Sequence, residues 1–295
     1  MTNPKLLLFL ALGVVALVYL VSWGRALAAG RAQGNGAAVP SLLESGIGFV
    51  TNFFDTLGIG SYAPTTALFR FFKLVPDEKI PGTLTLGHTL PTIVQSFIFI
   101  AIVQVDFITL TLLILASIVG AWLGAGVVAK WPKRNIQIGM GLALVAAAGL
   151  FLMANLGIVA GGGTATGLSG ARLVFGLVGN FILGALMTLG IGLYGPCLIM
   201  ISLLGMEPRA AFPIMMASCA FLMPVAGVKF SKEQAYRARP ALGLAVGGIP
   251  AVLIAALIVK SMSLVAVRWL VIVVVLYTAV GLLRSAFSTR AEPVT

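Results

Sequence analysis

Charged residues are scarce in this chain of 295 residues. Asp, Glu, Lys and Arg make up only 9% of the sequence, whereas a soluble domain carries about 25%. Hydrophobic types supply 60%. Such a composition argues against a water-soluble globular protein and predicts an all-α polytopic membrane protein.

Histidine and cysteine, which often bind metals or act as nucleophiles, are almost missing. His88 is the only histidine, and Cys197 and Cys219 lie in apolar stretches without a CxxC pair or a Cys/His cluster. The sequence also lacks a Walker-type nucleotide motif. We therefore expect no metal, no other cofactor and no enzymatic activity, and we interpret the cysteines as buried thiols.

Acidic residues number eight against nineteen Lys and Arg, which gives a net charge of +11. The basic residues cluster between apolar stretches, so the positive-inside bias explains them better than nucleic-acid binding does. The clusters at 130–134 and 229–239 predict cytoplasmic loops. We expect a multi-pass protein of the plasma or inner membrane with a cytoplasmic C-terminus, whose partners are the bilayer and a small anionic solute.

Long apolar stretches are abundant, and they divide the chain into about nine to eleven membrane-embedded segments. The first, Leu6–Ser22, is interpreted as a retained helix, and a cleaved signal peptide is the alternative. The others are Leu42–Leu57, Thr65–Leu74, Thr83–Val103, Phe107–Ala129, Ile136–Leu156, Leu173–Leu189, Cys197–Leu204, Phe212–Val228, Leu242–Val259 and Val265–Leu283.

The chain contains an internal repeat. A shift of 132 residues aligns Gly48–Leu90 with Asn180–Leu222 without a gap, and eleven of the 43 pairs are identical. Residues 56–64 match 188–196 at seven of nine positions. We therefore expect a first helix and linker (1–40), repeat 1 (41–160), a glycine-rich connecting loop (161–172), repeat 2 (173–285) and a C-terminal tail (286–295).

Each repeat is interrupted by a Gly-Ile-Gly-x-Tyr-x-Pro break. The loop charges predict opposite orientations for the two repeats, so the breaks should form re-entrant turns that meet near the midplane, as in many secondary transporters. Packing kinks are the alternative. The expected substrate-binding residues are Gly58, Gly60, Ser61, Tyr62, Pro64, Gly190, Gly192, Tyr194, Pro196 and Thr92.

Polar residues in apolar surroundings indicate that the titratable groups of the expected carrier lie in repeat 1. Asp55 lies three residues before Gly58, and a helical stripe follows at Thr85, His88, Thr92 and Gln95. We interpret Asp55 and His88 as candidate proton-coupling groups, and internal hydrogen bonding is the alternative. In repeat 2 their positions hold Met187 and Ala220.

Two pairs of glycines, Gly120 with Gly124 and Gly243 with Gly247, have the small-xxx-small spacing of close helix packing. They fit contacts within the chain or contacts in a homodimer equally well.

The repeated glycine turns, the duplicated halves and the length resemble the TauE/SafE family of sulfite and organosulfonate exporters. The resemblance covers roughly Leu42–Leu283, and its sharpest residues are Gly58-Ile59-Gly60 with Pro64 and Gly190-Ile191-Gly192 with Pro196. Ser61-Tyr62 and Leu193-Tyr194 stand where the family has further glycines. The resemblance implies a secondary exporter of small sulfur-containing anions with both turns facing the substrate. A passive anion channel and a carrier for another small organic solute are the alternatives.

Overall fold

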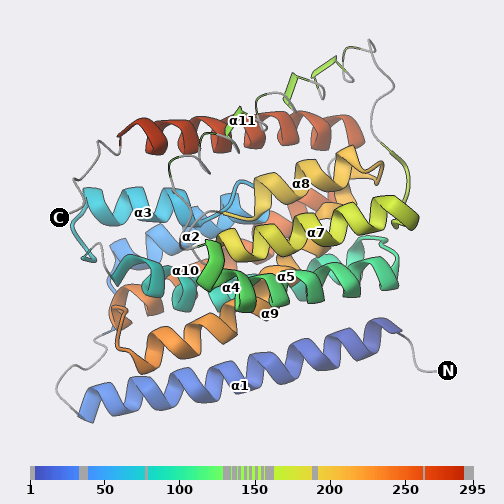
Figure 1. Ribbon diagram of the computed structural model, residues 1–295. Helices are drawn as coiled ribbons and strands as arrows, with labels where there is room; N and C mark the ends of the chain where they lie inside the picture. Colours follow the sequence, from blue (N-terminus) through green and yellow to red (C-terminus); the bar gives the residue numbers. More distant parts are fainter. Residues whose placement is uncertain are drawn as a thin grey trace.

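In a computed structural model, the described residues are 4–32, 39–76, 79–128, 163–187, 192–261 and 263–288, with isolated positions between 134 and 156. These residues form helices and no β-strand. Figure 1 shows one bundle, with α1 and α11 on opposite edges. The helices are α1 (Pro4–Ala32), α2 (Leu42–Thr56), α3 (Tyr62–Phe71), α4 (Ile80–Ile102), α5 (Phe107–Val128), α7 (Gly170–Met187), α8 (Tyr194–Leu203), α9 (Ala211–Lys232), α10 (Ala238–Ser261) and α11 (Leu264–Ser288).

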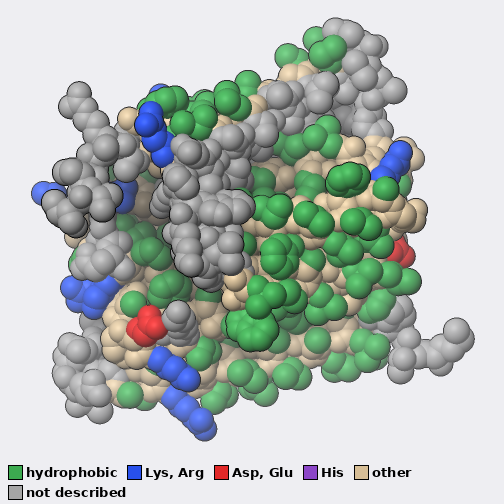
Figure 2. All heavy atoms as spheres, in the orientation of Figure 1, with side chains coloured by type: hydrophobic (Ala, Val, Ile, Leu, Met, Phe, Trp, Pro, Cys, Tyr) green, Lys and Arg blue, Asp and Glu red, His purple; other side chains and the backbone are tan. Residues whose placement is uncertain are grey.

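Five of the described helices, α1, α4, α7, α9 and α10, are long and apolar enough to cross a bilayer. In Figure 2, hydrophobic side chains cover much of the visible face between the two ends of the bundle. These features confirm an all-α, membrane-embedded protein. The predicted segment Ile136–Leu156 lies largely outside the described residues.

Most helices begin or end a few residues away from the predicted bounds, and α1 and α7 are two examples. The first helix continues to Ala32 instead of ending at Ser22, because the alanine-rich stretch that follows has a high helix propensity. It packs on the bundle through buried Leu12, Tyr19 and Trp23, and the Tyr19 hydroxyl donates to the Leu86 carbonyl over 2.6 Å. Helix α7 begins at Gly170, within the stretch predicted to be the connecting loop.

The two halves of the chain contain corresponding helices. Helices α3 and α8 both have ten residues, and their first residues, Tyr62 and Tyr194, are 132 positions apart. Helix α2 packs against α10 while its counterpart α7 packs against α5, and α4 packs against α9 at the centre. Every one of these pairs joins one helix from each half.

Glycines let two of these pairs approach until their backbones touch. A side chain at Gly243 or Gly247 of α10 would collide with Glu44 or Ser45 of α2, and one at Gly120 of α5 would collide with the Phe181 backbone of α7. The glycines predicted to mediate either packing or dimerisation therefore serve contacts within the chain. For Gly124 the structure describes only the helical backbone.

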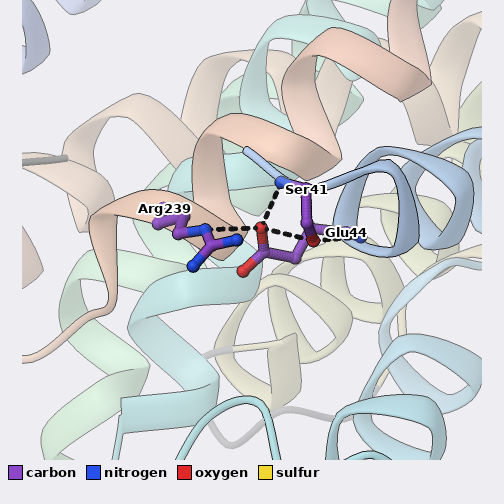
Figure 3. Close-up of polar contacts among 3 residues, drawn as sticks. All are labelled: Ser41, Glu44 and Arg239. Carbon is purple, nitrogen blue, oxygen red and sulfur yellow. Dashed lines mark hydrogen bonds and ion pairs between the residues drawn. The ribbon is translucent and has the colours of Figure 1, made fainter. Parts of the chain in front are cut away.

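The start of α2 and the end of α3, both distant from the first break, lie together. At the start of α2, the Ser41–Glu44 capping box is held to Arg239 by an ion pair of 3.1 Å (Figure 3). The end of α3 lines a pocket with Arg237. We call this end of the bundle, with residues 70–76 and 232–239, the basic end.

Candidate functional site

The first break depends on two glycines with left-handed backbones. Gly58 has a φ of 97° and Gly60 a φ of 87°, which other residue types rarely adopt. The Gly58 and Ile59 amides donate to the carbonyls of Asp55 (2.8 Å) and Phe54 (3.1 Å), and these bonds close the last turn of α2. Three residues after Gly58, Ser61 precedes α3. The break therefore places the Asp55 side chain and the start of α3 side by side.

The second break is described only in part, because Gly190 lies outside the described residues. Gly192 does not have a left-handed φ, unlike its counterpart Gly60. Pro64 and Pro196 occupy the third positions of α3 and α8, where proline costs no helical hydrogen bond. The two breaks therefore match in sequence but not in every backbone angle.

Gln95 of α4 links the two breaks. Its amide nitrogen donates to Asp55 Oδ2 and to Thr56 Oγ1, both over 2.9 Å. Its amide oxygen accepts from the Tyr194 hydroxyl over 2.9 Å. All four side chains are buried, with Gln95 and Thr56 fully inaccessible to solvent. One side chain from the centre of the bundle thus joins the end of α2 to the start of α8.

The Asp55 carboxylate has further polar neighbours. Ser61 faces it with both its hydroxyl and its backbone N–H, and Tyr194 approaches it from the second half of the chain. The Ser61 hydroxyl makes no capping hydrogen bond within α3, so it is free to serve the carboxylate. Thr92 lies one turn before Gln95 on α4 and faces the Tyr194 hydroxyl.

His88, which is fully buried, forms a second polar group on α4. Its Nδ1 lies 3.0 Å from Asn52 Oδ1, and its Nε2 lies 3.1 Å from Thr65 Oγ1. Asn52 comes from α2 and Thr65 from α3, so His88 holds together the helices on either side of the first break. The Tyr62 ring lies 6.0 Å away, and its hydroxyl donates to Thr85 Oγ1 over 3.2 Å.

The hydrogen bonds around His88 limit where its protons sit. The Asn52 amide nitrogen donates to the Gly48 carbonyl over 2.7 Å, so the Asn52 oxygen must face His88 and accept from Nδ1. Thr65 Oγ1 lies 2.7 Å from the Ser61 carbonyl and has one hydrogen for two neighbours. When the His88 ring is neutral, its Nε2 accepts a hydrogen bond from the Thr65 hydroxyl. A protonated ring donates from Nε2, and the hydroxyl then donates to Ser61.

His88 can therefore gain a proton without losing a hydrogen bond, since only the Thr65 hydroxyl turns. The Ser61 carbonyl also accepts the Thr65 backbone N–H over 3.0 Å, so it keeps a donor in both arrangements. Ser61 thus faces Asp55 on one side and, through Thr65, His88 on the other. Asp55 and His88 are thus connected through Ser61 and Thr65.

The corresponding positions of the second half hold apolar and sulfur-containing side chains. Met187 replaces Asp55, Cys197 replaces Thr65 and Ala220 replaces His88. The Cys219 thiol lies 3.5 Å from the Met187 sulfur, and both cysteines are free and buried. The carboxylate and the imidazole of the centre thus belong to the first half.

The structure brings Asp55, His88, Ser61, Tyr62, Tyr194 and Thr92 into one buried region. The site residues predicted from the sequence did not include Gln95, Asn52, Thr56 and Thr65. These four residues supply most of the hydrogen bonds of the region. Gln95 already lay on the polar stripe of α4, and a buried amide in an apolar helix needs partners. That requirement was the signal that could have identified it.

Among the described residues, no group of three or more His, Cys, Asp or Glu side chains is placed to hold a metal ion. A scan against protein-family models and searches of curated proteins and of solved structures returned no match.

Proposed function

We propose that this protein is a secondary transporter that moves a small anion across the cell membrane, with its site between the two breaks. The observation that carries the proposal is Gln95, which joins Asp55 of the first break to Tyr194 of the second. A buried polar centre at the meeting point of two broken helices is typical of carriers that expose one site alternately to each side. The resemblance to TauE/SafE exporters favours sulfite or an organosulfonate as the anion.

The arrangement of helix ends supports an inverted repeat with re-entrant breaks. Helix α2 begins and α3 ends at the basic end, whereas the described residues around the start of α7 and the end of α8 lie at the other end, where Arg172 is beside Gly205. Each pair, α2 with α3 and α7 with α8, therefore enters the bundle and returns to its own end. By the positive-inside bias, we place the basic end in the cytoplasm.

The buried carboxylate favours proton-linked transport. An oxyanion 4 Å from an ionised Asp55 is repelled by about 1 kcal/mol in water and by about 4 kcal/mol at an effective dielectric constant of 20. Protonation of Asp55 removes this repulsion, so the anion and a proton bind together. His88 supplies a second group, whose protonation requires only that the Thr65 hydroxyl turns toward the Ser61 carbonyl.

Flux of sulfite into liposomes that contain the purified protein tests this function. We expect saturable uptake, counterflow against internal sulfite and movement of protons with the anion. Asp55→Asn keeps the hydrogen bond from Gln95 but cannot ionise, so it should retain anion exchange and lose the accompanying proton flux. Flux that rises linearly with concentration and shows no counterflow would indicate a channel instead.

The substrate class is tested by thermal stability of the protein with sulfite, sulfate, sulfonates, carboxylates and amino acids, since a ligand that binds the folded state stabilises it. A saturable shift with a sulfur oxyanion supports the proposal. A shift with an amino acid or a cation alone would refute the substrate class and leave a carrier for another solute.

A further inference from the structure

A cavity lies between α1, which stands outside the two repeats, and the end of α9. It has a volume of about 260 Å³. Helix α1 contributes Tyr19, Ser22, Trp23 and Ala26, whose spacing places them on one side of the helix. Leu86 of α4 closes the cavity on the side of the bundle. The cavity therefore lies where the extra helix is fastened to the two helices that cross at the centre.

The lining changes from apolar to polar toward the end of α9. Gly227 and Val228 come first along the helix, and Ser231, Lys232 and Gln234 follow within two turns. Lys232 and Gln234 belong to the basic end, so the polar part of the cavity lies at that end and the apolar part lies deeper in the bundle. A ligand that fits this gradient has a polar group at the basic end and an apolar part below it.

Trp23 supplies the cavity with a hydrogen-bond donor that has no acceptor. Its side chain is 3% exposed, and its Nε1 makes no hydrogen bond with any described residue. The Tyr236 hydroxyl faces the indole without reaching hydrogen-bond geometry. Tyr19, by contrast, donates its hydroxyl to the Leu86 carbonyl over 2.6 Å. Because a buried donor without a partner is costly, the indole calls for an acceptor oxygen from a ligand.

The polar end of the cavity also carries donors. The exposed side chains of Lys232 and Gln234 both have N–H groups, and Glu233, which lies between them in the sequence, is not part of the lining. Phosphate and ester oxygens accept hydrogen bonds from ammonium, amide and indole groups alike. The donors of the cavity therefore favour a ligand that presents oxygens of this kind.

The position of the cavity indicates where such a ligand comes from. Helix α1 lies at one edge of the bundle, beside the end of α9 (Figure 1). Most of α1 is not buried against the protein, and Val225 of α9, just before the cavity, is 60% exposed. These apolar surfaces face lipid, and tryptophan and tyrosine near basic residues are typical of the level of the lipid head groups. Membrane phospholipids are thus the amphipathic molecules beside the cavity.

The size of the cavity limits which part of a phospholipid enters it. Pockets that enclose a whole drug-sized ligand have volumes of roughly 300–1,000 Å³. At about 260 Å³, this cavity has room for the glycerol and phosphate of one lipid, whose acyl chains then stay along the apolar surfaces of α1 and α9.

We propose that the cavity between α1 and α9 binds the phosphate end of one membrane phospholipid, with Trp23 as a donor to its oxygens. The lipid belongs to the leaflet at the basic end and fastens α1 to α9. This inference does not depend on the proposed transport of an anion, because it concerns a different part of the bundle and a different ligand.

The test measures thermal unfolding of the full-length protein in detergent with increasing lipid, since a ligand of the folded state raises its stability. Phosphatidylglycerol and phosphatidylethanolamine present the phosphate, diacylglycerol has the chains alone, and glycerol 3-phosphate has the polar part alone. The informative variant is Trp23→Phe, which keeps an aromatic ring and removes the N–H. The matched control is Trp122→Phe on α5, where the side chain is 77% exposed and outside the cavity.

We expect both phospholipids to give a saturable increase in melting temperature. Trp23→Phe should raise the lipid concentration at half-saturation about fivefold, the equivalent of one hydrogen bond, and Trp122→Phe should leave it unchanged. Without lipid, Trp23→Phe should melt at the same temperature as the wild type or higher, because it removes an unpaired donor. An equal response to diacylglycerol, or an unchanged half-saturation in Trp23→Phe, would overturn the proposal. An equal response to glycerol 3-phosphate would also overturn it, in favour of a soluble phosphate ester.

A second measurement needs no variant. Mass spectrometry of the intact wild-type protein, released from detergent after lipid addition, should show one retained phospholipid and no retained diacylglycerol. Retention of both lipids to the same extent, or of neither, would refute a phosphate-binding cavity. Ala26→Phe, which fills the cavity from α1, should abolish the retention, and full retention in that variant would place the lipid elsewhere.

Discussion

Tyr194→Phe should loosen the contact between the two halves of the chain while leaving the shape of the centre unchanged. The substitution removes one hydrogen bond, from the Tyr194 hydroxyl to the Gln95 oxygen over 2.9 Å, inside a buried region. A buried hydrogen bond of this kind contributes about 1 kcal/mol. Since the bond joins the two breaks, it stabilises only arrangements in which they are together. The closed arrangement should therefore lose about fivefold in population relative to open ones.

The repeat provides a matched control. Tyr62 is the counterpart of Tyr194, but its hydroxyl donates to Thr85 within the same half over 3.2 Å. Tyr62→Phe therefore removes a similar bond that does not join the two breaks. Both variants should lose comparable stability against unfolding, but only Tyr194→Phe should favour opening.

The rate at which a thiol reagent labels a native cysteine measures the opening of the bundle. Cys197 lies on α8 near Tyr194 and is fully buried, so a small thiol reagent reaches it only when the bundle opens. In a Cys219→Ala background, we expect Tyr194→Phe to speed the labelling of Cys197 about fivefold. Tyr62→Phe should not change the rate. Equal rates in the two variants would refute the role given to Gln95, as would a full additional effect of Tyr194→Phe in a Gln95→Leu protein.

Three further predictions concern the ends of α2, α3 and α8. Gly60→Ala should destabilise the protein by about 1–2 kcal/mol because of its φ of 87°, whereas Gly192→Ala, with open space for a Cβ and no left-handed φ, should be neutral; thermal unfolding of both variants distinguishes them. Thr65→Val, which removes the hydroxyl between His88 and Ser61, should reduce proton-linked flux, and Thr65→Ser should restore it; equal flux in both would contradict the proton arrangement at His88. Ser41→Ala should cost about 1 kcal/mol of stability through loss of the capping box, with flux unchanged.

Sequence patterns predicted the helices and the breaks because both have local causes. Apolar stretches of sufficient length form membrane helices, and glycines next to a proline interrupt them. The offset of 132 residues placed α3 and α8 in register, and the structure gives both the same length. The helical stripe on α4 correctly grouped Thr85, His88, Thr92 and Gln95 on a buried side.

The partners of those residues could not be predicted, because they depend on how distant helices approach each other. Gln95 and Tyr194 are 99 residues apart, and nothing local to either indicates the other. Thr65 was read as part of a short apolar segment, yet its hydroxyl decides where the His88 protons sit. The left-handed φ of Lys73 could not be predicted either, because a lysine in the sequence does not indicate such a backbone conformation.

The close packing of α2 with α10 and of α5 with α7 means that the sequence halves are not independent bodies. Each pair exchanges one helix between the halves and fits backbone against backbone at glycines such as Gly48 and Gly184. A chain cut between α5 and α7 should therefore yield fragments that each expose a bare glycine groove and assemble only when produced together. Neither half supplies by itself the partner for its own glycine-lined helices, so each half depends on the other to complete its packing.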